Sequence, residues 1–304
     1  MSVLVTGGTG FVGRHIVEAL ASSDTDVVRY NRDYTEHDSP LVQCVQGELF
    51  DIPALARAIK DLNVATVIHT AAMSHPGISV ELPITTFAAN VDGTLKLFEA
   101  ARMTGLRRIV NFSSECAYGH QPLDTVVTES AVLAPNTPYA VTKMATEHLG
   151  RVYNDLYGLD VVSLRVSEVY GPGLRMPEVL KDMLIAAMHA EPFTMPEGAE
   201  HRFHFVHVRD VATAAVLAAT AAHLKQPVYN ISSGQQVTLG ELAALITSRY
   251  PRARIDVGPG FWTGWDRQGP WDISAAARDF GYVPQWTLER GLADYADWLT
   301  EHPY

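Results

Sequence analysis

The chain has 304 residues, of which 47% are hydrophobic and 19% are charged, and its formal net charge is -11. These values describe a globular chain rather than a disordered or membrane protein. No run of clustered lysine and arginine interrupts the acidity, so we expect neither nucleic acid nor a membrane surface as a partner.

Short β-branched runs alternate with helical patterns through the first 166 residues. Val12, Ile16 and Leu20, for example, mark one helix face at four-residue spacing. We predict strands at 3–5, 27–28, 41–45, 64–69, 108–113 and 160–166, and helices at 12–20, 55–62, 87–103 and 138–157. Strands that alternate with helices predict an α/β fold with a parallel sheet covered on both faces, the doubly wound (Rossmann) arrangement.

The alternation loosens after Gly173. Helices are predicted at 177–188, 211–222 and 239–248, and short strands at 203–208, 228–231 and 254–257. We expect residues 1–166 to form a dinucleotide-binding domain. Residues 167–304 are expected to form mainly a smaller α/β lobe for the substrate, with a segment from about 203 to 231 returning to the first domain.

A glycine-rich turn, Thr6 to Gly13, joins the first predicted strand to the first predicted helix. Glycine permits positive φ and lets backbone approach a pyrophosphate closely, while a helix N-terminus offers unpaired N–H groups. A glycine cluster alone could also be a tight turn that binds nothing. Its position at the first strand–helix turn favours a dinucleotide site. The predicted cofactor-binding residues here are Gly7, Gly10, Phe11, Val12 and Gly13.

The end of the second predicted strand bears on the choice between NAD and NADP. An NAD site usually has a carboxylate there to bind the ribose 2′-hydroxyl. Here Asn31 is neutral and does not repel a 2′-phosphate, and Arg32 could pair with one. A solvated surface arginine is the alternative interpretation. We predict a preference for NADP(H), with NAD(H) as the alternative.

Tyr139 and Lys143 lie four residues apart in a predicted helix, and Ser114 stands upstream of them. Residues at this spacing share one helix face, which brings an ammonium beside a phenol. A free phenol has a pKa of about 10 and is a poor base at neutral pH. A nearby cation favours the phenolate, so we expect acid–base catalysis at a carbinol or carbonyl carbon.

Eight segments together resemble the extended short-chain dehydrogenase/reductase superfamily, specifically its NAD-dependent epimerase/dehydratase branch. They are Thr6–Gly13, Ile68–Ala72, Asn90–Thr94, Ser113–Gly119, Tyr139–Lys143, Leu164–Gly173, Phe205–Val211 and Gly281–Pro284. The resemblance covers nearly the whole chain, and the order and spacing of the segments specify the superfamily rather than a substrate.

The resemblance implies roles for individual residues. Tyr139 matches the general acid/base, Lys143 its partner that also holds the nicotinamide ribose, and Ser114 the residue that hydrogen-bonds the reacting oxygen. Further cofactor contacts are implied at Glu48, Leu49, Ala71, Ala72 and Asn90.

Departures from the family pattern bear on the reaction and the substrate. Dehydratases of this branch carry Asp-Glu directly after the catalytic threonine, whereas Glu115 and Cys116 follow Ser114 here, which disfavours elimination. Nucleotide-sugar epimerases often carry Asn where this chain has Glu168, and a carboxylate beside a pyrophosphate would repel it.

Those epimerases also often carry Arg at the position of Phe203, although Arg202 or Arg267 could serve a phosphate instead. The departures therefore argue against a nucleotide diphosphate sugar without excluding one. The candidate substrate-binding residues are Ser114, Glu115, Cys116, Glu168, Arg202 and Arg267.

Other potential ligand groups have structural interpretations. His201, His204 and His207 resemble a metal cluster, but on one strand His204 would point to the face opposite the other two, so we expect no metal site. Cys44 and Cys116 have neither a disulfide framework nor metal-ligand spacing. Trp262, Trp265 and Trp271 suit either packing of the lobe or a wall for the substrate. His69 ends a buried strand and is expected to be a framework residue.

We expect reversible hydride transfer at a secondary alcohol or ketone carbon of a sugar-like or other small polar substrate. One alternative is a nucleotide-sugar 4-epimerase that retains its NAD, and another is a dinucleotide-sensing protein that performs no chemistry. The early first strand leaves no room for a signal peptide. We therefore expect a cytoplasmic protein, and a homodimer paired through the helices at 87–103 and 138–157, as the resemblance implies.

Overall fold

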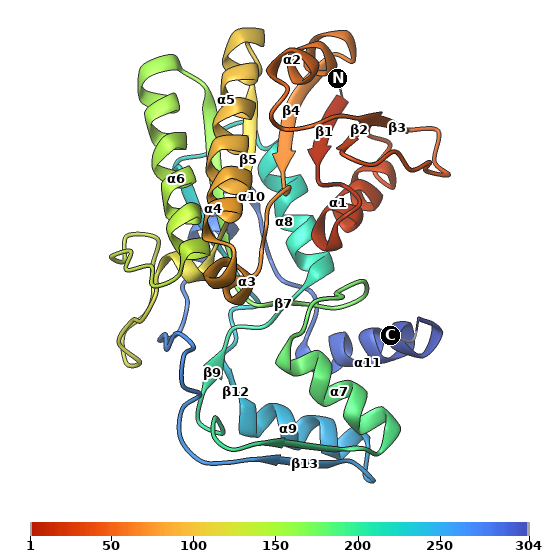
Figure 1. Cartoon of the computed structure of the whole chain (residues 1–304), viewed down its shortest axis with the longest axis vertical. Helices are drawn as coiled ribbons and strands as arrows, with labels where there is room; N and C mark the ends of the chain where they lie inside the picture. Colours follow the sequence, from red (N-terminus) through yellow and green to blue (C-terminus); the bar gives the residue numbers. More distant parts are fainter. Residues whose placement is uncertain (1, 303–304) are drawn as a thin grey trace.

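The computed structural model describes residues 2–302 and has two parts, a sheet domain and a smaller lobe below it (Figure 1). Seven parallel strands form the central sheet in the order β11-β6-β5-β4-β1-β2-β3. They are β1 (Ser2–Thr6), β2 (Val27–Asn31), β3 (Val42–Gln46), β4 (Val64–His69), β5 (Arg108–Ser114), β6 (Asp160–Val166) and β11 (Val228–Ile231). The predicted doubly wound sheet is confirmed.

Helices cover both faces of this sheet. Along β1, Val3 and Val5 face one helical layer and Leu4 faces the other, because successive strand residues point in opposite directions. The first layer contains α1 (Phe11–Ala21), α8 (Val208–Thr220) and α10 (Ser274–Phe280), and the second contains α2 (Ile52–Asp61), α5 (Gly93–Thr104) and α6 (Pro138–Tyr157). Burial on both faces explains the nearly continuous apolar runs of the strands.

The helix predicted at 87–103 is interrupted. Proline starts α3 (Pro76–Glu81) and α4 (Pro83–Phe87), and a π-helical turn, η1 (Ala88–Asp92), then leads into α5. Proline suits the first helical turn because its missing N–H has no partner there. Residues 87–103 are helical as predicted, but apolar spacing does not reveal the π turn within them, a feature that often lies at functional sites.

The lobe is built from three helices and three two-stranded sheets, and a third apolar cluster forms its core. Its helices are α7 (Val179–His189), α9 (Leu239–Arg249) and α11 (Leu288–Glu301), and its strand pairs are β7 (Val169–Tyr170) with β10 (Val206–His207), β8 (Pro192–Met195) with β13 (Arg254–Val257), and β9 (Arg202–Phe203) with β12 (Val237–Thr238). The single strand predicted at 203–208 was wrong, because β9 and β10 pair with different partners.

The chain passes between the two parts more than once. After the first lobe segments, α8 packs against α1 and β11 pairs with β6, so both lie in the sheet domain. A later segment also returns, since α10 packs against β11. Within residues 2–302, no helix is both long and apolar enough to cross a membrane.

Candidate active site

Ser114, Tyr139 and Lys143 come together at the carboxyl end of β5. Ser114 ends that strand, while Tyr139 lies in the first turn of α6 and Lys143 one turn later. The Thr137 side chain caps α6 by accepting the Ala140 N–H at 3.2 Å, which fixes where the helix begins. Lys143 Nζ lies 5.6 Å from the centroid of the Tyr139 ring. The predicted placement of these two side chains on one helix face is confirmed.

Lys143 is enclosed by the sheet domain. Its side chain is 6% exposed, and its Nζ donates a hydrogen bond to the backbone carbonyl of Phe112 at 2.6 Å. Burial lowers the pKa of Lys143 to about 8, against the opposing effects of Cys116 and Glu147. The ammonium is therefore charged at neutral pH but close to its titration range.

The pKa of the Tyr139 hydroxyl differs from the value that the sequence led us to expect. Burial raises the pKa of Tyr139 well above its ordinary value, and Cys116 adds to the rise, while a hydrogen bond with Ser114 acts in the opposite direction. We expected Lys143 to bring this pKa toward neutrality, and that expectation was wrong for the chain without cofactor. Removing water from the site penalises the phenolate more than the neighbouring groups favour it.

Carboxyl groups gather on the other side of Tyr139. Glu115 belongs to a short 3-10 turn, η2 (Glu115–Ala117), and it lies near Glu168, which follows β6. Burial raises the pKa of Glu168 to about 7 and that of Glu115 well above its ordinary value, and the charge of Glu168 raises the latter further. Two carboxyls in contact in this way favour the sharing of one proton.

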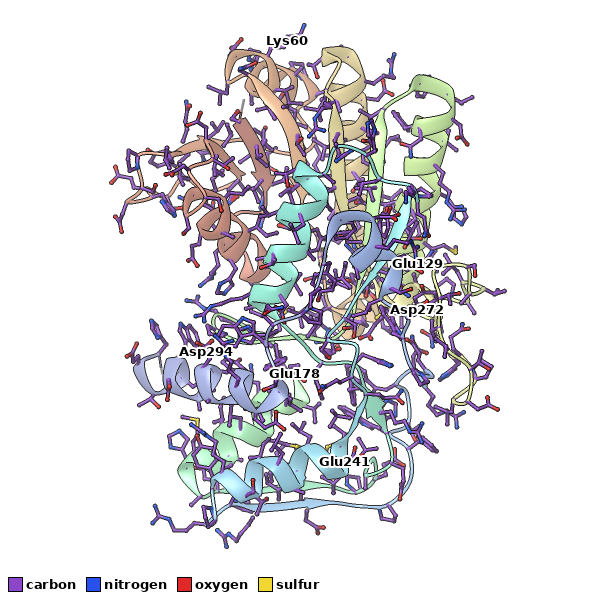
Figure 2. All side chains as sticks on the ribbon, turned by 180° about the vertical axis from the view of Figure 1, so that it is seen from behind. Lys60, Glu129, Glu178, Glu241, Asp272 and Asp294 are labelled. Atoms are coloured by element: carbon purple, nitrogen blue, oxygen red, sulfur yellow. The ribbon has the colours of Figure 1, made fainter. Side chains whose placement is uncertain are left out.

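Glu178 and Asp266 extend this acidic side. Glu178 begins α7 where the lobe meets the sheet domain (Figure 2) and accepts the N–H groups of Leu180 and Lys181, each at 2.9 Å. Burial raises its pKa to about 8, and the charge of Glu168 contributes. Burial also raises the pKa of Asp266. We did not predict these two carboxyls from the sequence, because nothing in the local sequence indicates which residues of the lobe lie near them.

The glycine turn has the geometry of a pyrophosphate cradle. Gly7 has a φ of +67°, and a Cβ there would lie 2.9 Å from the backbone of Ala71. A Cβ at Gly13 would collide with the carbonyl of Gly7. Gly10 begins α1 without a side-chain cap, so the first-turn N–H groups of that helix are available to an anion. The turn therefore fits a dinucleotide.

Asn31, which ends β2, and Arg32, which follows it, also have polar groups available to a ligand. Asn31 donates from Nδ2 to Thr9 Oγ1 at 2.6 Å, while its Oδ1 is buried without a partner. Arg32 is exposed, and no hydrogen bond or ion pair to the rest of residues 2–302 engages its guanidinium. An orphaned buried acceptor beside the glycine turn fits a hydroxyl group of a bound nucleotide.

Asn90 is committed to the protein interior. It is 2% exposed, its Oδ1 accepts the Met73 N–H at 2.8 Å, and its Nδ2 donates to Thr142 Oγ1 at 3.0 Å. It thereby ties the segment after Ala71 and Ala72 to α6. Asn90 also lines a small pocket together with Ala71, Ala72 and Lys143, and its role near the nicotinamide ribose stays a prediction.

Glu48 and Leu49 lie beyond the end of β3. Glu48 is exposed, and its backbone carbonyl accepts the Tyr30 hydroxyl at 3.2 Å. Leu49 packs close to Gly93, the first residue of α5. Both therefore lie on the side of the sheet domain where β2 and the glycine turn end.

The two candidate phosphate-binding arginines do not converge on Tyr139. Arg202 is exposed on β9 and reaches Gln236 at 3.4 Å, whereas the next residue, Phe203, is buried and stacks on Phe205 at 5.2 Å. Arg267 lies over the ring of Phe261 at 5.4 Å. Arg202 and Phe203 point to opposite sides of β9, because neighbouring strand residues do so, and a phosphate contact of Arg202 or Arg267 stays a prediction.

The histidines and tryptophans have separate surroundings. His204 packs against Trp271 at 5.6 Å, and His207 stacks on Trp286 at 4.2 Å. Residues 2–302 contain no group of three histidine, cysteine, aspartate or glutamate side chains arranged for a metal ion. Trp271 is 6% exposed and packs on Tyr118, so it belongs to the core.

Trp262 and Trp265 stack on each other at 4.8 Å, and Trp265 is 36% exposed. Of the three tryptophans, Trp265 thus has the most open position. His69 bridges Thr6 and Thr94 through hydrogen bonds of 2.7 and 2.9 Å, as expected of a framework residue.

Sequence reasoning missed an ion pair beneath the site. Glu147 lies one turn beyond Lys143 on α6, and Arg165 lies on β6. The two are joined at 2.6 Å, and each is at most 3% exposed. Two signals were available, namely the repeated four-residue spacing from Tyr139 and a charged residue in an otherwise apolar strand.

A glycine cradle at the first strand–helix turn and a Ser–Tyr–Lys group at the end of β5 define an oxidoreductase of the short-chain dehydrogenase/reductase type. Residues 3–232 match the model of the NAD dependent epimerase/dehydratase family, and the chain belongs to that family. It is therefore an enzyme whose family uses a nicotinamide dinucleotide.

Known relatives extend over the full length of the chain. A dTDP-glucose 4,6-dehydratase of Actinoplanes sp. is 30% identical, over 98% of this chain and 97% of the relative. The solved structure of MoeE5 in complex with UDP-glucuronic acid and NAD is 29% identical, with a TM-score of 0.89 and 99% of both chains covered. The UDP-glucose 4-epimerase of Thermus thermophilus in complex with NAD is 28% identical, with a TM-score of 0.86 over 99% of this chain and 100% of that one.

Proposed function

We propose that the protein catalyses reversible hydride transfer at a secondary alcohol or ketone carbon of a sugar-like or other small polar substrate. The observation that carries this proposal is the buried group of Ser114, Tyr139 and Lys143, in which Ser114 is near enough to Tyr139 to lower its pKa and Lys143 shares the helix face of Tyr139. The group lies at the same edge of the sheet as the glycine cradle, where doubly wound folds bind ligands.

Each side chain has a defined task in this reaction. In oxidation, the Tyr139 phenolate takes the proton of the substrate hydroxyl while Ser114 holds the oxygen in line. Lys143 stabilises the negative charge on Tyr139. In reduction, Tyr139 returns the proton to the oxygen. A bound nicotinamide dinucleotide supplies the acceptor or donor of the hydride.

The acidic side of the site supports a substrate without a nucleotide diphosphate. Burial already raises the cost of ionising both Glu115 and Glu168, the charge of Glu168 raises it further for Glu115, and a diphosphate nearby would add repulsion. Phe203 is buried in an aromatic stack and offers a phosphate no charge. These features favour a neutral or positively charged polar substrate over a sugar nucleotide.

A UDP-hexose 4-epimerase with retained NAD is the second candidate. It is favoured by the solved relatives of similar length, one of them the UDP-glucose 4-epimerase in complex with NAD. In this mechanism Tyr139 performs both proton transfers within one catalytic cycle, and the ketone rotates in the site between them. Arg267 is the nearest candidate for a phosphate contact, since it lies next to Asp266 at the edge of the site.

We also propose that NADP(H) is the preferred cofactor. Arg32 is exposed and unengaged by the other described residues, so its guanidinium is available to a 2′-phosphate. NAD(H) is the alternative, because the unpartnered Oδ1 of Asn31 suits a ribose hydroxyl and MoeE5 was solved with NAD.

A homodimer in the cytoplasm is the proposed working form. Apolar side chains remain exposed along α4, α5 and α6, among them Ile84 at 85%, Met103 at 60% and Leu156 at 69%. These helices lie next to one another in Figure 1, and a second copy would cover such side chains. Sedimentation at micromolar concentration tests this assembly, and a monomer there would contradict it.

One screen separates the candidate functions. The purified protein is denatured to release and identify any bound dinucleotide, and native protein is then assayed with sugars, sugar acids, amino sugars and aromatic ketones plus NADP(H) or NAD(H). Net change in absorbance at 340 nm, with turnover dependent on added cofactor, supports the oxidoreductase. Conversion of a UDP-sugar without added cofactor, by protein that carries tightly held NAD(H), would select the epimerase instead. Bound dinucleotide without turnover of any substrate would support a sensing protein.

A further inference from the structure

Three buried side chains follow one another along the inner face of α6. Tyr139, Lys143 and Glu147 are spaced by four residues, and they are 7%, 6% and 3% exposed. Side chains at this spacing are neighbours on a helix, about 5–6 Å apart at Cβ. The proposed function uses the first two and leaves unexplained why a carboxylate is buried beside them.

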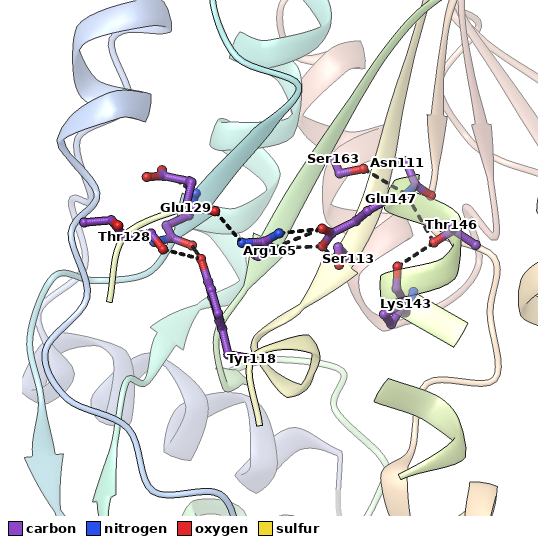
Figure 3. Close-up of polar contacts among 11 residues, drawn as sticks. Asn111, Ser113, Tyr118, Thr128, Glu129, Lys143, Thr146, Glu147, Ser163 and Arg165 are labelled. Carbon is purple, nitrogen blue, oxygen red and sulfur yellow. Dashed lines mark hydrogen bonds and ion pairs between the residues drawn. The ribbon is translucent and has the colours of Figure 1, made fainter. Parts of the chain in front are cut away.

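Glu147 is held from two strands at once. Arg165 on β6 donates to both carboxylate oxygens, with Nη2 to Oε2 at 2.6 Å and Nε to Oε1 at 2.9 Å. Ser113, the neighbour of Ser114 on β5, donates its hydroxyl to Oε1. Figure 3 shows this arrangement between the helix and the two strands. A bidentate pair of this kind fixes both position and orientation.

The same face of α6 has two further links to β5. Lys143 Nζ donates a hydrogen bond to the carbonyl of Phe112. Asn111 Nδ2 reaches Thr146 Oγ1 on α6 at 3.4 Å, and also Ser163 Oγ on β6 at 3.2 Å (Figure 3). Three successive residues of β5 are thus tied to one face of α6, through Thr146, Lys143 and Glu147. These links determine how far Tyr139 on the helix stands from Ser114 at the end of the strand.

Arg165 is itself held on the side away from Glu147. Its guanidinium lies 4.6 Å from the centroid of the Tyr118 ring, and its Nη1 donates to the carbonyl of Glu129 at 3.0 Å. The Tyr118 hydroxyl in turn donates to Asn230 Oδ1 on β11 at 2.7 Å. Arg165 therefore cannot move away from Glu147 without breaking its contacts to Tyr118 and Glu129.

The charges along this line alternate. The Glu147 carboxylate pairs directly with the Arg165 guanidinium, and its charge also raises the pKa of Lys143, in a region from which water is largely excluded. An arginine keeps its proton in proteins, whereas a buried lysine readily loses one. Without the negative charge of Glu147, Lys143 is therefore the group that would give up its proton.

Other titratable groups also face Lys143. Tyr139 lies beside it on α6, Cys116 faces it from η2, and His69 faces it from β4. His69 is neutral at working pH, because burial lowers its pKa to about 3. Cys116 keeps its proton, because burial raises its pKa. Glu147 is therefore the resident anion among these neighbours.

We propose that Glu147, held by Arg165, is a positioning residue of the active site, which sets the place of Tyr139 and keeps the ammonium of Lys143 charged. The proposal rests on the proposed function for its catalytic meaning. Its structural content, a lysine whose charge depends on one buried carboxylate, can be measured in the protein without substrate or cofactor. The two claims can therefore fail separately.

The chain suits a direct measurement, because it has only five lysines, Lys60, Lys96, Lys143, Lys181 and Lys225. Lysine labelled with ¹³C at Cε gives one NMR signal for each, and Lys143→Arg identifies the signal of Lys143. We expect Lys143 to titrate well below the exposed lysines. In Glu147→Gln its midpoint falls by about one to two pH units, as the loss of a neighbouring buried charge predicts.

Control variants separate charge from packing. Glu147→Asp and Arg165→Lys keep the charges but disturb the fit, and we expect the Lys143 midpoint to stay within about 0.3 pH units of the wild-type value. Glu99 offers a matched control, since it accepts hydrogen bonds from Arg102 and Tyr153 on α5 and α6. Glu99→Gln should leave Lys143 unchanged.

Glu147→Gln leaves an unpaired buried arginine and risks unfolding. Glu147→Gln combined with Arg165→Met replaces the whole pair by neutral groups. In this double variant we expect the Lys143 midpoint to fall by less than in Glu147→Gln, because the loss of the Arg165 charge partly offsets the loss of the nearer Glu147 charge. An unchanged Lys143 midpoint in either variant would overturn the proposal. So would equal midpoint changes in Glu147→Gln and Arg165→Lys, since these would indicate a purely structural role.

Discussion

The two sides of Tyr139 are built in different ways. Toward the sheet domain, Lys143, Glu147 and Arg165 form an alternating line in which each charged group has a partner. Toward the lobe, Glu115 and Glu168 lie near each other, and the pKa of each is raised by burial. On the sheet side, the charged groups pair with other groups of the protein. On the lobe side, burial favours the protonated, uncharged form of the carboxyl groups.

This difference separates residues that hold a fixed geometry from residues that can respond to a ligand. A fully paired network holds a fixed geometry, which suits a reaction that requires one arrangement of hydroxyl, phenol and amine. Carboxyls that keep protons in the resting protein can respond to a ligand, since a cationic or hydrogen-bonding substrate would change their ionisation. We therefore attribute the chemistry to the sheet side and the choice of substrate to the lobe side.

The largest expected effect on turnover comes from removing the hydroxyl of Tyr139, the residue between the two sides. Tyr139→Phe deletes the acid/base but keeps the ring, so turnover should fall by about 10²–10⁴-fold while dinucleotide binding persists. Steady-state rates and fluorescence titration with the reduced cofactor measure the two properties. Near-wild-type turnover in this variant would reject the assignment of Tyr139.

The paired side is predicted to carry much of the stability. Arg165→Met leaves the Glu147 carboxylate buried without its cation, and this should lower the free energy of unfolding by about 3–5 kcal/mol. Urea denaturation measures the change. Arg102→Met, which removes a surface partner of Glu99, is the matched control and should leave the unfolding midpoint nearly unchanged. Equal losses in both variants would remove the contrast between the two sides.

The acidic side predicts how stability depends on pH. The pKa of Glu168 rises from 4.5 to about 7 and that of Glu178 from 4.5 to about 8, so the folded state binds more protons than the unfolded state between these values. Their stabilisation is complete below pH 4.5 and is lost as the pH rises through about 7 to 8. Lys143 acts in the opposite sense, but only above pH of about 8.

Glu168→Gln removes one of these groups. We expect the fall in unfolding free energy between pH of about 5 and about 8 to become shallower, by on the order of 1–3 kcal/mol over that range. Thermal and urea unfolding at several pH values give the slope. A slope identical to that of the wild-type protein would show that Glu168 ionises normally in the folded state.

The smallest expected effect concerns the cofactor, at a distance from both sides of Tyr139. Arg32→Ala should lower kcat/KM for NADP(H) by about tenfold, because one exposed charge-assisted hydrogen bond is lost, and should leave the value for NAD(H) unchanged. Comparable kcat/KM values for the two cofactors in the wild-type protein would contradict the proposed preference.

The sheet and the glycine turn could be predicted because their signals are local. Apolar runs, four-residue spacing and clustered glycines each reflect a nearby backbone requirement. The position of Arg202 and the pKa of Tyr139 could not be predicted in this way, since the first depends on a strand break near Phe205 and the second on how completely the folded chain excludes water. Glu147 lies between these cases, because its spacing was visible but its partner Arg165 comes from a separate strand.

The way the chain crosses between its two parts has a consequence for biosynthesis. The edge strand β11 reaches its place beside β6 only after the first lobe segments have been made, and α10, which covers it, follows more than forty residues later. A nascent chain that stops near residue 166 therefore exposes the unpaired edge of β6. We expect the ribosome to have released most of the polypeptide before either part can reach its final form, which makes chaperone contact during synthesis advantageous.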